Sequence, residues 1–337
     1  MAGLLQHLIN GLAEGTIYAL VALGYTMVYG VLKLINFAHG DVMMVGAYVG
    51  YAAAFVLGDG ALGSLWGAVL VFLVSILFCG LLGWLVERFA YRPLREKPRL
   101  TALITAIGIS FTLSYGFQLK VQPELAGKKV TLLPGADPRT FPEIIVPVEW
   151  VTLHVPAPAA APEDVDPTVP HDPADDFVEI IIWNWQVISF VIALGLMGGL
   201  QYLVFRTKFG RAMRAVSHDH RVAALLGIPV DRVIAFTFML GSALAACAGI
   251  LYAIKDTLIQ PMLGVQLGLK AFVAAVIGGI GNVQGAVLGA VALALCEELV
   301  VGYASSSWRD AVAFGFLIIV LLLRPQGLLG RVQAEKV

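Results

Sequence analysis

Charge is scarce in this 337-residue sequence, since only 13% of the residues are Asp, Glu, Lys or Arg. Soluble domains carry about 25%. The formal net charge is -1, so the sequence offers no basic surface of the kind that binds nucleic acid. Cysteines are also few, and Cys79, Cys247 and Cys296 lie in separate apolar runs that form no metal-binding or disulfide pattern. These scarcities exclude an ordinary cytosolic enzyme, a disordered chain and a nucleic-acid-binding protein.

Motifs for nucleotides and metals are missing as well. No GxxxxGK[ST] sequence occurs, so we expect no ATP binding through a P-loop. The glycines of 279–285 have the wrong spacing for a dinucleotide loop, and no strand precedes them. His218 and His220 are more simply explained as a solvated pair than as metal ligands. No nucleophile–base pattern supports an intramembrane enzyme. We therefore predict no catalytic residue, no cofactor and no metal.

Hydrophobic residues, by contrast, make up 59% of the chain, and the mean hydropathy is +0.84. A membrane-spanning helix needs about 20 apolar residues, whereas an outer-membrane barrel shows short alternating segments. We therefore expect an all-α, polytopic integral membrane protein with one transmembrane domain over 1–337. It should have about 8–10 transmembrane or half-membrane helices. The seventh and ninth candidates are short, and the Gly-rich seventh is a candidate for a broken helix. The candidate spans are 12–32, 41–58, 64–86, 101–118, 184–205, 233–254, 267–281, 285–302 and 309–323.

The distribution of Lys and Arg predicts the orientation. Five basic residues lie in 87–100 and six in 206–232, and the tail adds Arg324, Arg331 and Lys336. Because cytoplasmic loops are enriched in Lys and Arg, we place these segments inside. Nine crossings then put the N-terminus outside and the C-terminus in the cytoplasm, although a re-entrant segment would change the parity. No Lys or Arg precedes Lys33, so we expect no cleaved signal peptide.

The 119–183 connection is then extracytoplasmic. It holds 11 of the 16 prolines and 11 of the 23 acidic residues, but only four basic ones. The Pro-, Ala- and Asp-rich centre, 155–176, cannot bury a core, so we expect it to be extended or poorly ordered. It is either a docking surface for a soluble partner or, as we favour, a tolerated insertion in an exposed loop.

Polar residues interrupt the apolar pattern at two Gly-rich turns, INFAHGD and GGIGNVQG, one in each half of the chain. Such paired interruptions point to a transport pathway. Most of the nearby glycines are explained by close helix packing. Ionisable residues within spans are costly in lipid and usually face a bundle interior. For Glu297 and Glu298 we weigh a gating contact with Lys270 or a partner subunit equally against helix capping or snorkelling. For Glu14 and Lys270 we favour helix capping or snorkelling. The pathway candidates are Asn36, His39, Asp41, Asn282, Gln284, Glu297 and Glu298.

The basic 206–232 segment contains a short apolar patch at 222–227. Ser217 or Asp219 can cap a helix over roughly 218–226, and Gly227 followed by Pro229 can end it. A short amphipathic helix on the cytoplasmic face suits docking into a groove of a soluble partner. The alternative is an interfacial helix that lies on lipid.

Three stretches together resemble the permease subunits of branched-chain amino acid ABC importers, the LivH type. They are KLINFAHGDVMMVGAYVGY, GRAMRAVSHDHRVAALLGIPVDRVIAFTF and LKAFVAAVIGGIGNVQGAVLGAVALALCEEL, and the ending LLRPQGLLG also fits. The resemblance covers nearly the whole chain except about 125–180, which looks like an insertion relative to the family. It implies an ABC importer permease fold in a prokaryotic inner membrane.

The resemblance also implies partners. A second permease subunit, related or identical, completes the pore, two cytoplasmic ATP-binding subunits drive it, and a periplasmic substrate-binding protein delivers the amino acid. The family's ATPase-docking motif, normally Glu-Ala-Ala followed by Gly, matches at Ala223, Ala224 and Gly227, and Leu226 lies within the same motif. Val222 stands where the acidic residue usually is, which puts any acidic contact in doubt. On this interpretation 206–232 is the cytoplasmic coupling loop.

Two alternatives remain open from the sequence. Similar permeases carry urea or short amides, and selectivity in such systems resides mostly in the binding protein. An ion-coupled secondary transporter would need no ATPase partners but would need a buried carboxylate, for which Asp41, Glu297 and Glu298 are the candidates.

Overall fold

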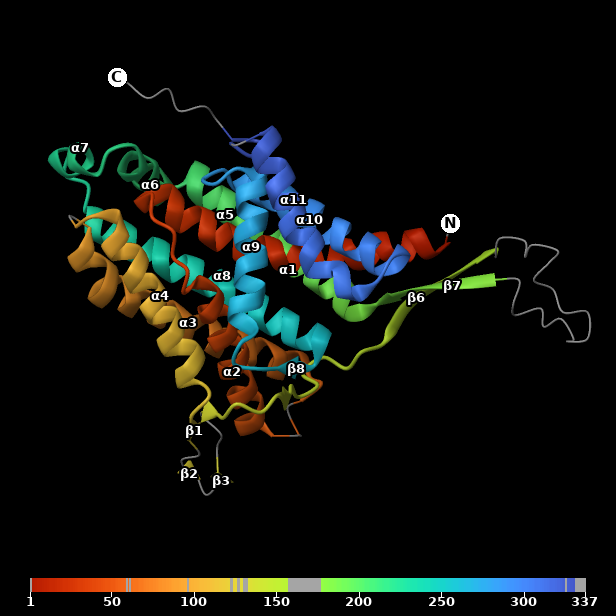
Figure 1. The fold of residues 1–337 in the computed structure, drawn as a ribbon. Coiled ribbons are helices and arrows are strands. Elements are labelled where there is room, and N and C mark those ends of the chain that lie inside the picture. The colour runs from red at the N-terminus through yellow and green to blue at the C-terminus, as the bar shows by residue number, and fades with distance from the viewer. Residues whose placement is uncertain are drawn as a thin grey trace, which may run out of the picture.

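The apolar runs of the sequence form long helices that pack side by side (Figure 1). The computed structural model describes residues 2–330 except 59, 61, 96, 122–123, 126–127, 130–132, 157–176 and 325. Short turns η1 (Glu87–Tyr91, a π-helix) and η2 (Arg92–Leu94) continue the helix over Leu65–Val86, and η4 (Ser306–Trp308) precedes the helix over Arg309–Leu323. The α-helices are α1 (Ala2–Leu32), α2 (His39–Leu57), α3 (Leu65–Val86), α4 (Arg99–Gly116), α5 (Asn184–Arg206), α6 (Lys208–His218), α7 (His220–Leu225), α8 (Val230–Asp256), α9 (Leu263–Gly278), α10 (Val283–Tyr303) and α11 (Arg309–Leu323).

These helices confirm the predicted membrane fold. Among the described residues, 7 helices are long and apolar enough to cross a membrane, and Leu100–Gly116 and Leu263–Gly278 are shorter apolar helices. Together they match the predicted spans in order. The first span begins at Ala2, well before the expected residue 12. The seventh, α9, is short at 16 residues but is not broken, because its glycines pack against neighbouring helices. Its length of about 24 Å is less than the ~30 Å hydrocarbon core.

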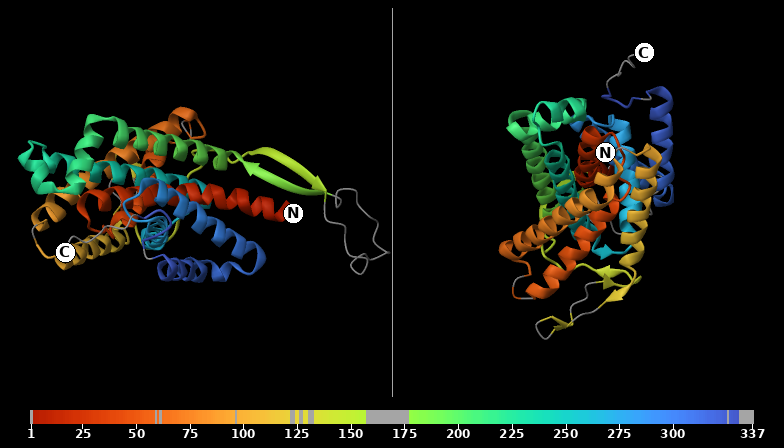
Figure 2. Two further views of the ribbon diagram at one scale, coloured as in Figure 1. Left: turned by 90° about the horizontal axis from the view of Figure 1, so that it is seen from above. Right: turned by 90° about the vertical axis from the view of Figure 1, so that its left-hand side faces the viewer.

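The basic segments lie at one end of the bundle (Figures 1 and 2). α6 and α7 lie at the upper left of Figure 1 and the end of α11 lies at the top, whereas the start of α1 and the ribbon of β6 (Glu149–Pro156) and β7 (Phe177–Trp183) lie at the right. Salt bridges from Arg92 and Arg95 to Asp231 join the 87–100 segment to the start of α8. At the opposite end, the Gln6 side chain exchanges hydrogen bonds with the main chain of Ile181. The segments expected to share a side of the membrane therefore lie together.

Short antiparallel ribbons form in the described parts of the 119–183 connection, one of them with β8 after α8, and the all-α expectation did not include them. The pairs are β1–β4, β2–β3, β5–β8 and β6–β7. The β6–β7 ribbon runs away from the bundle, and its register ends with Pro156 opposite Phe177. Most of the predicted Pro- and Asp-rich centre, residues 157–176, lies outside the described residues. The strands are β1 (Lys120–Val121), β2 (Glu124–Leu125), β3 (Lys128–Lys129), β4 (Leu133–Pro134), β5 (Arg139–Thr140), β6 (Glu149–Pro156), β7 (Phe177–Trp183) and β8 (Leu258–Ile259).

Burial separates central helices from peripheral ones. α1 packs against α5, α8, α9 and α10, and 83% of its apolar stretch is buried, against 17% for α5 and 11% for α11. Trp66 and Phe78 on α3 and Leu322 on α11 are among the exposed apolar side chains. Such surfaces suit contact with lipid or with another membrane subunit.

Glycines allow the central helices to touch. A Cβ atom on Gly40 would overlap the carbonyl oxygen of Gly264 and lie 2.6 Å from the Cα of Gly268, so α2 and α9 meet backbone to backbone. A Cβ on Gly285 would likewise overlap the carbonyl oxygen of Gly278 where α9 meets α10. These contacts confirm helix packing as the role of these glycines.

Candidate functional site

The residues expected to dock an ATP-binding subunit lie on α7 and the turn after it. Asp219, whose extended backbone separates α6 from α7, caps α7 by accepting hydrogen bonds from the N–H groups of Arg221 at 2.8 Å and Val222 at 3.1 Å. The predicted cap is confirmed, although the helix is shorter than expected because α6 continues to His218. The hydrogen bonds from Val222 and Arg221 lower the pKa of the Asp219 carboxyl, because they stabilise its ionised form.

The far end of α7 presents an apolar ridge. Leu225 and Leu226 are 87% and 74% exposed, whereas Ala223 is buried against the bundle. Gly227 ends the helix at φ +78, and its N–H donates to the carbonyl oxygen of Ala224 at 3.0 Å. Only glycine adopts this left-handed backbone without strain. α7 is therefore fixed at both ends and directs two leucines outward.

A charged anchor lies immediately beyond the ridge. Asp231, in the first turn of α8, accepts salt bridges from Arg92 and Arg95, and Arg95 also bonds Glu87. Glu87 is buried and opens the π-helical turn η1. π-Helical turns often occur at functional positions. The anchor thus ties the segment after α7 to the end of α3.

The pathway candidate Asn36 lies in the non-helical segment between α1 and α2. Its Oδ1 accepts hydrogen bonds from the Tyr91 hydroxyl at 2.9 Å and from the Ala38 N–H at 3.2 Å. Asn36 is 5% exposed. Tyr91 belongs to η1, which also contains Glu87 of the charged anchor. The non-helical segment between α1 and α2 is therefore hydrogen-bonded to this turn.

His39 and Asp41 follow at the buried start of α2. The His39 ring packs edge-on to Tyr25, with ring centroids 4.7 Å apart, in space left by Gly24. The Asp41 carboxylate accepts a hydrogen bond from the Ser114 hydroxyl on α4. The main-chain N–H of His39 donates to the carbonyl oxygen of Asn36 at 3.1 Å. The structure therefore groups the three candidates of the first turn in the bundle interior.

The second turn has a different arrangement. Asn282 caps α10 by accepting from the N–H groups of Gln284 and Gly285, and its own amide donates to the carbonyl oxygen of Leu329 at 2.9 Å. The Gln284 side chain is exposed. These contacts hold the C-terminal segment against the α9–α10 turn, and a pathway role for either residue stays a prediction.

Glu297 and Glu298 belong to an ion-pair cluster at the opposite end of α10. Lys270 lies 3.1 Å from Glu297 and 2.8 Å from Asp310. Arg309 bonds Glu298. The Tyr18 hydroxyl lies 3.0 Å from Glu297 and from Glu14. Glu14 also pairs with Lys255 and Arg309. The cluster comprises Glu14, Lys255, Lys270, Glu297, Glu298, Arg309 and Asp310.

The expectation that Glu14 and Lys270 snorkel or cap helix ends was wrong. Glu14 is 3% and Lys270 8% exposed, and both are held by opposite charges. A buried charge is tolerated when it is paired and hydrogen-bonded. Of the two alternatives weighed for Glu297, the contact with Lys270 is present, whereas its gating role stays a prediction.

Sequence reasoning missed Lys255, Arg309, Asp310 and Tyr18. Two signals were available in the sequence. The charged pair Arg309–Asp310 comes directly before an apolar run, and Lys255 comes at the end of the long apolar run over 233–254. Neither shows which residue it will meet, because the cluster joins α1, α8, α9, α10 and α11.

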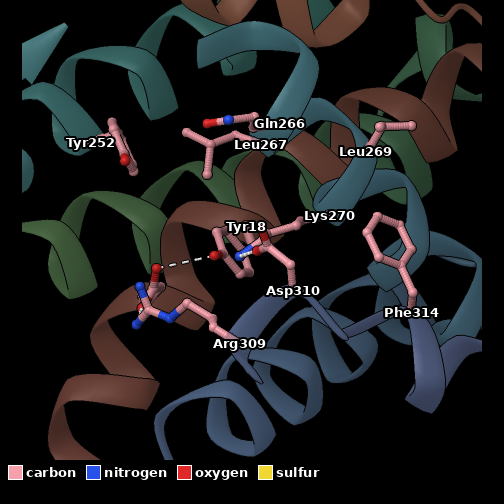
Figure 3. Close-up of a pocket in the computed structure, with 10 residues that line it drawn as sticks. Tyr18, Tyr252, Gln266, Leu267, Leu269, Lys270, Arg309, Asp310 and Phe314 are labelled. Carbon is pink, nitrogen blue, oxygen red and sulfur yellow. Dashed lines mark hydrogen bonds and ion pairs between the residues drawn. The ribbon is translucent and has the colours of Figure 1, made fainter. Parts of the chain in front are cut away.

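Two cavities flank α9. The larger, about 190 Å³, is lined by Lys270, Arg309 and Asp310 among others (Figure 3). The smaller, about 130 Å³, is mostly apolar and includes Tyr25, Phe37 and Ser110. None of the seven pathway candidates lines either cavity directly. Among the described residues, no three His, Cys, Asp or Glu side chains gather closely enough to hold a metal ion.

Comparison with known proteins identifies the family. The sequence profile described as "Branched-chain amino acid transport system / permease component" matches residues 7–321. The chain belongs to this family. The permease is 38% identical over 334 residues to the high-affinity branched-chain amino acid transport system permease protein LivH of Escherichia coli K12, covering 99% of this chain and 97% of LivH. It is 39% identical to the corresponding BraD protein of Pseudomonas aeruginosa, with 99% and 98% covered.

A more distant relative matches only locally. The autoinducer 2 import system permease protein LsrC of Klebsiella pneumoniae is 35% identical over 153 residues, which is 44% of this permease and 43% of LsrC.

Proposed function

We propose that this permease is the transmembrane subunit of a binding-protein-dependent ABC importer that moves branched-chain or related amino acids inward. ATP is hydrolysed by partner subunits, and the permease itself is not an enzyme. The observation that carries the proposal is α7, with two exposed leucines on a capped helix beside the charged anchor. A rigid apolar ridge of this kind suits insertion into a groove of a soluble subunit.

The proposed orientation places 206–232 and the C-terminus in the cytoplasm and the 119–183 connection outside, in a prokaryotic inner membrane. The enrichment of Lys and Arg in 87–100 and 206–232 supports this choice of sides. Val222–Gly227 then face the ATP-binding subunits, and the β6–β7 ribbon faces the periplasmic binding protein.

The proposed assembly contains a second permease subunit, either identical or related, and two cytoplasmic ATP-binding subunits. The exposed apolar faces of α3, α5 and α11 are available for the second permease or for lipid. The translocation pathway passes the candidate residues of the two turns and α10. In support, salt bridges link Asp231 through Arg95 to η1, and a hydrogen bond links η1 to Asn36. A displacement of α7 can therefore be transmitted through these contacts to the non-helical segment between α1 and α2.

Two alternatives to the proposal concern the substrate and the source of energy. Urea, short amides or another small solute remain alternatives within the same permease architecture, and LsrC shows that similar sequences belong to import systems named for a different molecule. An ion-coupled secondary transporter is less well supported, because Glu297 and Glu298 are paired with Lys270 and Arg309, which leaves Asp41 as its remaining candidate carboxylate.

The proposal is tested by purifying the tagged permease alone and after co-expression with candidate ATP-binding subunits from the same organism. We expect no ATP hydrolysis above background from the permease alone, because it has no P-loop. Stable co-purification of the ATP-binding subunits is expected in the second preparation. Hydrolysis that follows the permease alone, or uptake without any ATP-binding subunit, would contradict the proposal.

The ribbon allows a sharp test of the insertion in 119–183. Replacing 157–176 by Asn-Gly joins Pro156 to Phe177, which already face each other, through a favoured hairpin turn. We expect normal membrane insertion and normal assembly by size-exclusion chromatography, since exposed loops tolerate length changes at small entropic cost. Loss of assembly would show that the segment is needed for packing. Loss of uptake alone would support docking of the binding protein.

A further inference from the structure

We propose that the 190 Å³ cavity between α1, α8, α9 and α11 binds a small zwitterion, an α-amino acid with an aliphatic side chain. This inference rests on the proposed function and adds a substrate contact within the membrane subunit itself. Its key element is the ion pair between Lys270 on α9 and Asp310 on α11, which lies in the cavity wall.

The charges of the wall match both ends of an amino acid. Lys270 and Arg309 provide hydrogen-bond donors for a carboxylate, and Asp310 provides an acceptor for an ammonium group (Figure 3). Glu14 is a second carboxylate in the lining. The Lys270–Asp310 pair is 2.8 Å long, and the Asp310 side chain is 72% exposed. Because an exposed partner is weakly held, a ligand can separate the pair without a large penalty.

A zwitterion is the class of ligand that leaves no charge unpaired after this separation. Its carboxylate takes the place of Asp310 beside Lys270, and its ammonium group takes the place of Lys270 beside Asp310. Lys270 keeps Glu297 at 3.1 Å throughout, so the buried ammonium of the lysine is never without a partner. A ligand with a single charge would make only one of these two charge-assisted contacts, so it should bind more weakly than a zwitterion.

The remaining wall and the size suit an aliphatic side chain. Leu267, Leu269 and Phe314 provide apolar surface, and the latter two are partly exposed, so the cavity can be reached from outside the bundle. An engineered cavity of about 150 Å³ admits benzene. A volume of about 190 Å³ therefore has room for a small aliphatic amino acid.

The test uses the complete importer complex in nanodiscs, without the binding protein and without ATP. Binding of radiolabelled leucine is measured at equilibrium and is challenged with leucinol, which lacks the carboxylate, and with 4-methylpentanoate, which lacks the ammonium. Uptake of leucine with binding protein and ATP is measured in parallel in proteoliposomes. We expect leucine to bind to the wild-type complex and both analogues to compete at least tenfold more weakly.

Two variants and a control locate the site. Asp310→Asn keeps the shape but removes the charge, and it should weaken leucine binding at least tenfold. Gln266→Trp fills the cavity from an exposed position without removing an ion pair, and it should also weaken binding at least tenfold. Asp137→Asn removes another exposed aspartate that does not line the cavity, and it should bind leucine as the wild type does. Size-exclusion chromatography verifies that all three assemble.

The outcomes separate the two proposals. If the wild type takes up leucine but does not bind it without the binding protein, or if both cavity variants bind leucine normally, the zwitterion site is overturned and the importer function stands. If leucine binds as expected but no branched-chain amino acid is taken up, the cavity assignment stands and the transport assignment fails.

Discussion

Ala224→Glu and Gly227→Val are each expected to abolish ATP-driven uptake, at least tenfold below wild type, while the permease still reaches the membrane. Ala224 is exposed on α7, so a glutamate there would not disturb the bundle but would place an unpaired charge in the groove of the ATP-binding subunit. Gly227 has φ +78, and a β-branched residue at this angle strains the turn and redirects the leucine ridge. Transport assays and co-purification of the ATP-binding subunits measure both effects.

The matched control is Ala304→Glu. Ala304 is an exposed alanine after the end of α10, at the opposite end of that helix from the α9–α10 turn. The same substitution there should leave association with the ATP-binding subunits unchanged. If Ala224→Glu and Gly227→Val both transport normally with full association, α7 is not the coupling element.

Breaking the ion-pair cluster should have the second largest effect, on stability. Glu297 is fully buried and receives hydrogen bonds from Lys270 and Tyr18. Removing one partner of a buried pair costs about 3–5 kcal/mol because the other charge is left uncompensated. We therefore expect Glu297→Leu, and separately Lys270→Met, to lower the thermal unfolding midpoint in detergent clearly.

The double variant Lys270→Met/Glu297→Leu should lose less stability than the sum of the two single variants, because neither charge is then left behind. Glu179→Gln is the control, since Glu179 is an exposed glutamate on the β6–β7 ribbon and should change stability by less than about 0.5 kcal/mol. Additive losses in the double variant, or single variants as stable as the control, would show that the pair does not hold the helices together.

The spans could be predicted because lipid imposes a local rule. Each helix must supply its own backbone hydrogen bonds and about 20 apolar residues, so α2, α5 and α8 are visible in the sequence alone. The α7 cap was equally local, since Asp219 bonds residues two and three positions ahead. The extended start of α1 was not predicted, because its first turns are less apolar and are held by β7 through Gln6.

The charged centre could be predicted only in part. Glu297 was identified as costly in lipid and Lys270 as one possible partner, but the second partner, Tyr18, lies 279 residues away along the chain and was missed. No periodic pattern reports such contacts. At Asn282 the sequence suggested a pathway role, which stays a prediction, but it did not show that the side chain caps α10 and bonds Leu329. Polar residues in a membrane sequence thus indicate where side chains form hydrogen bonds or ion pairs inside the bundle, and only the fold shows which residues are their partners.

The central claim is that this chain forms the amino-acid pathway of an importer driven by partner ATPases. The most direct measurement is uptake of radiolabelled leucine into proteoliposomes that contain the complete complex, with binding protein on the substrate side and ATP on the other. We predict uptake that requires ATP, the ATP-binding subunits and this permease, and that is lost with Ala224→Glu but retained with Ala304→Glu. Uptake that continues without ATP, or is unchanged when this permease is omitted, would contradict the account.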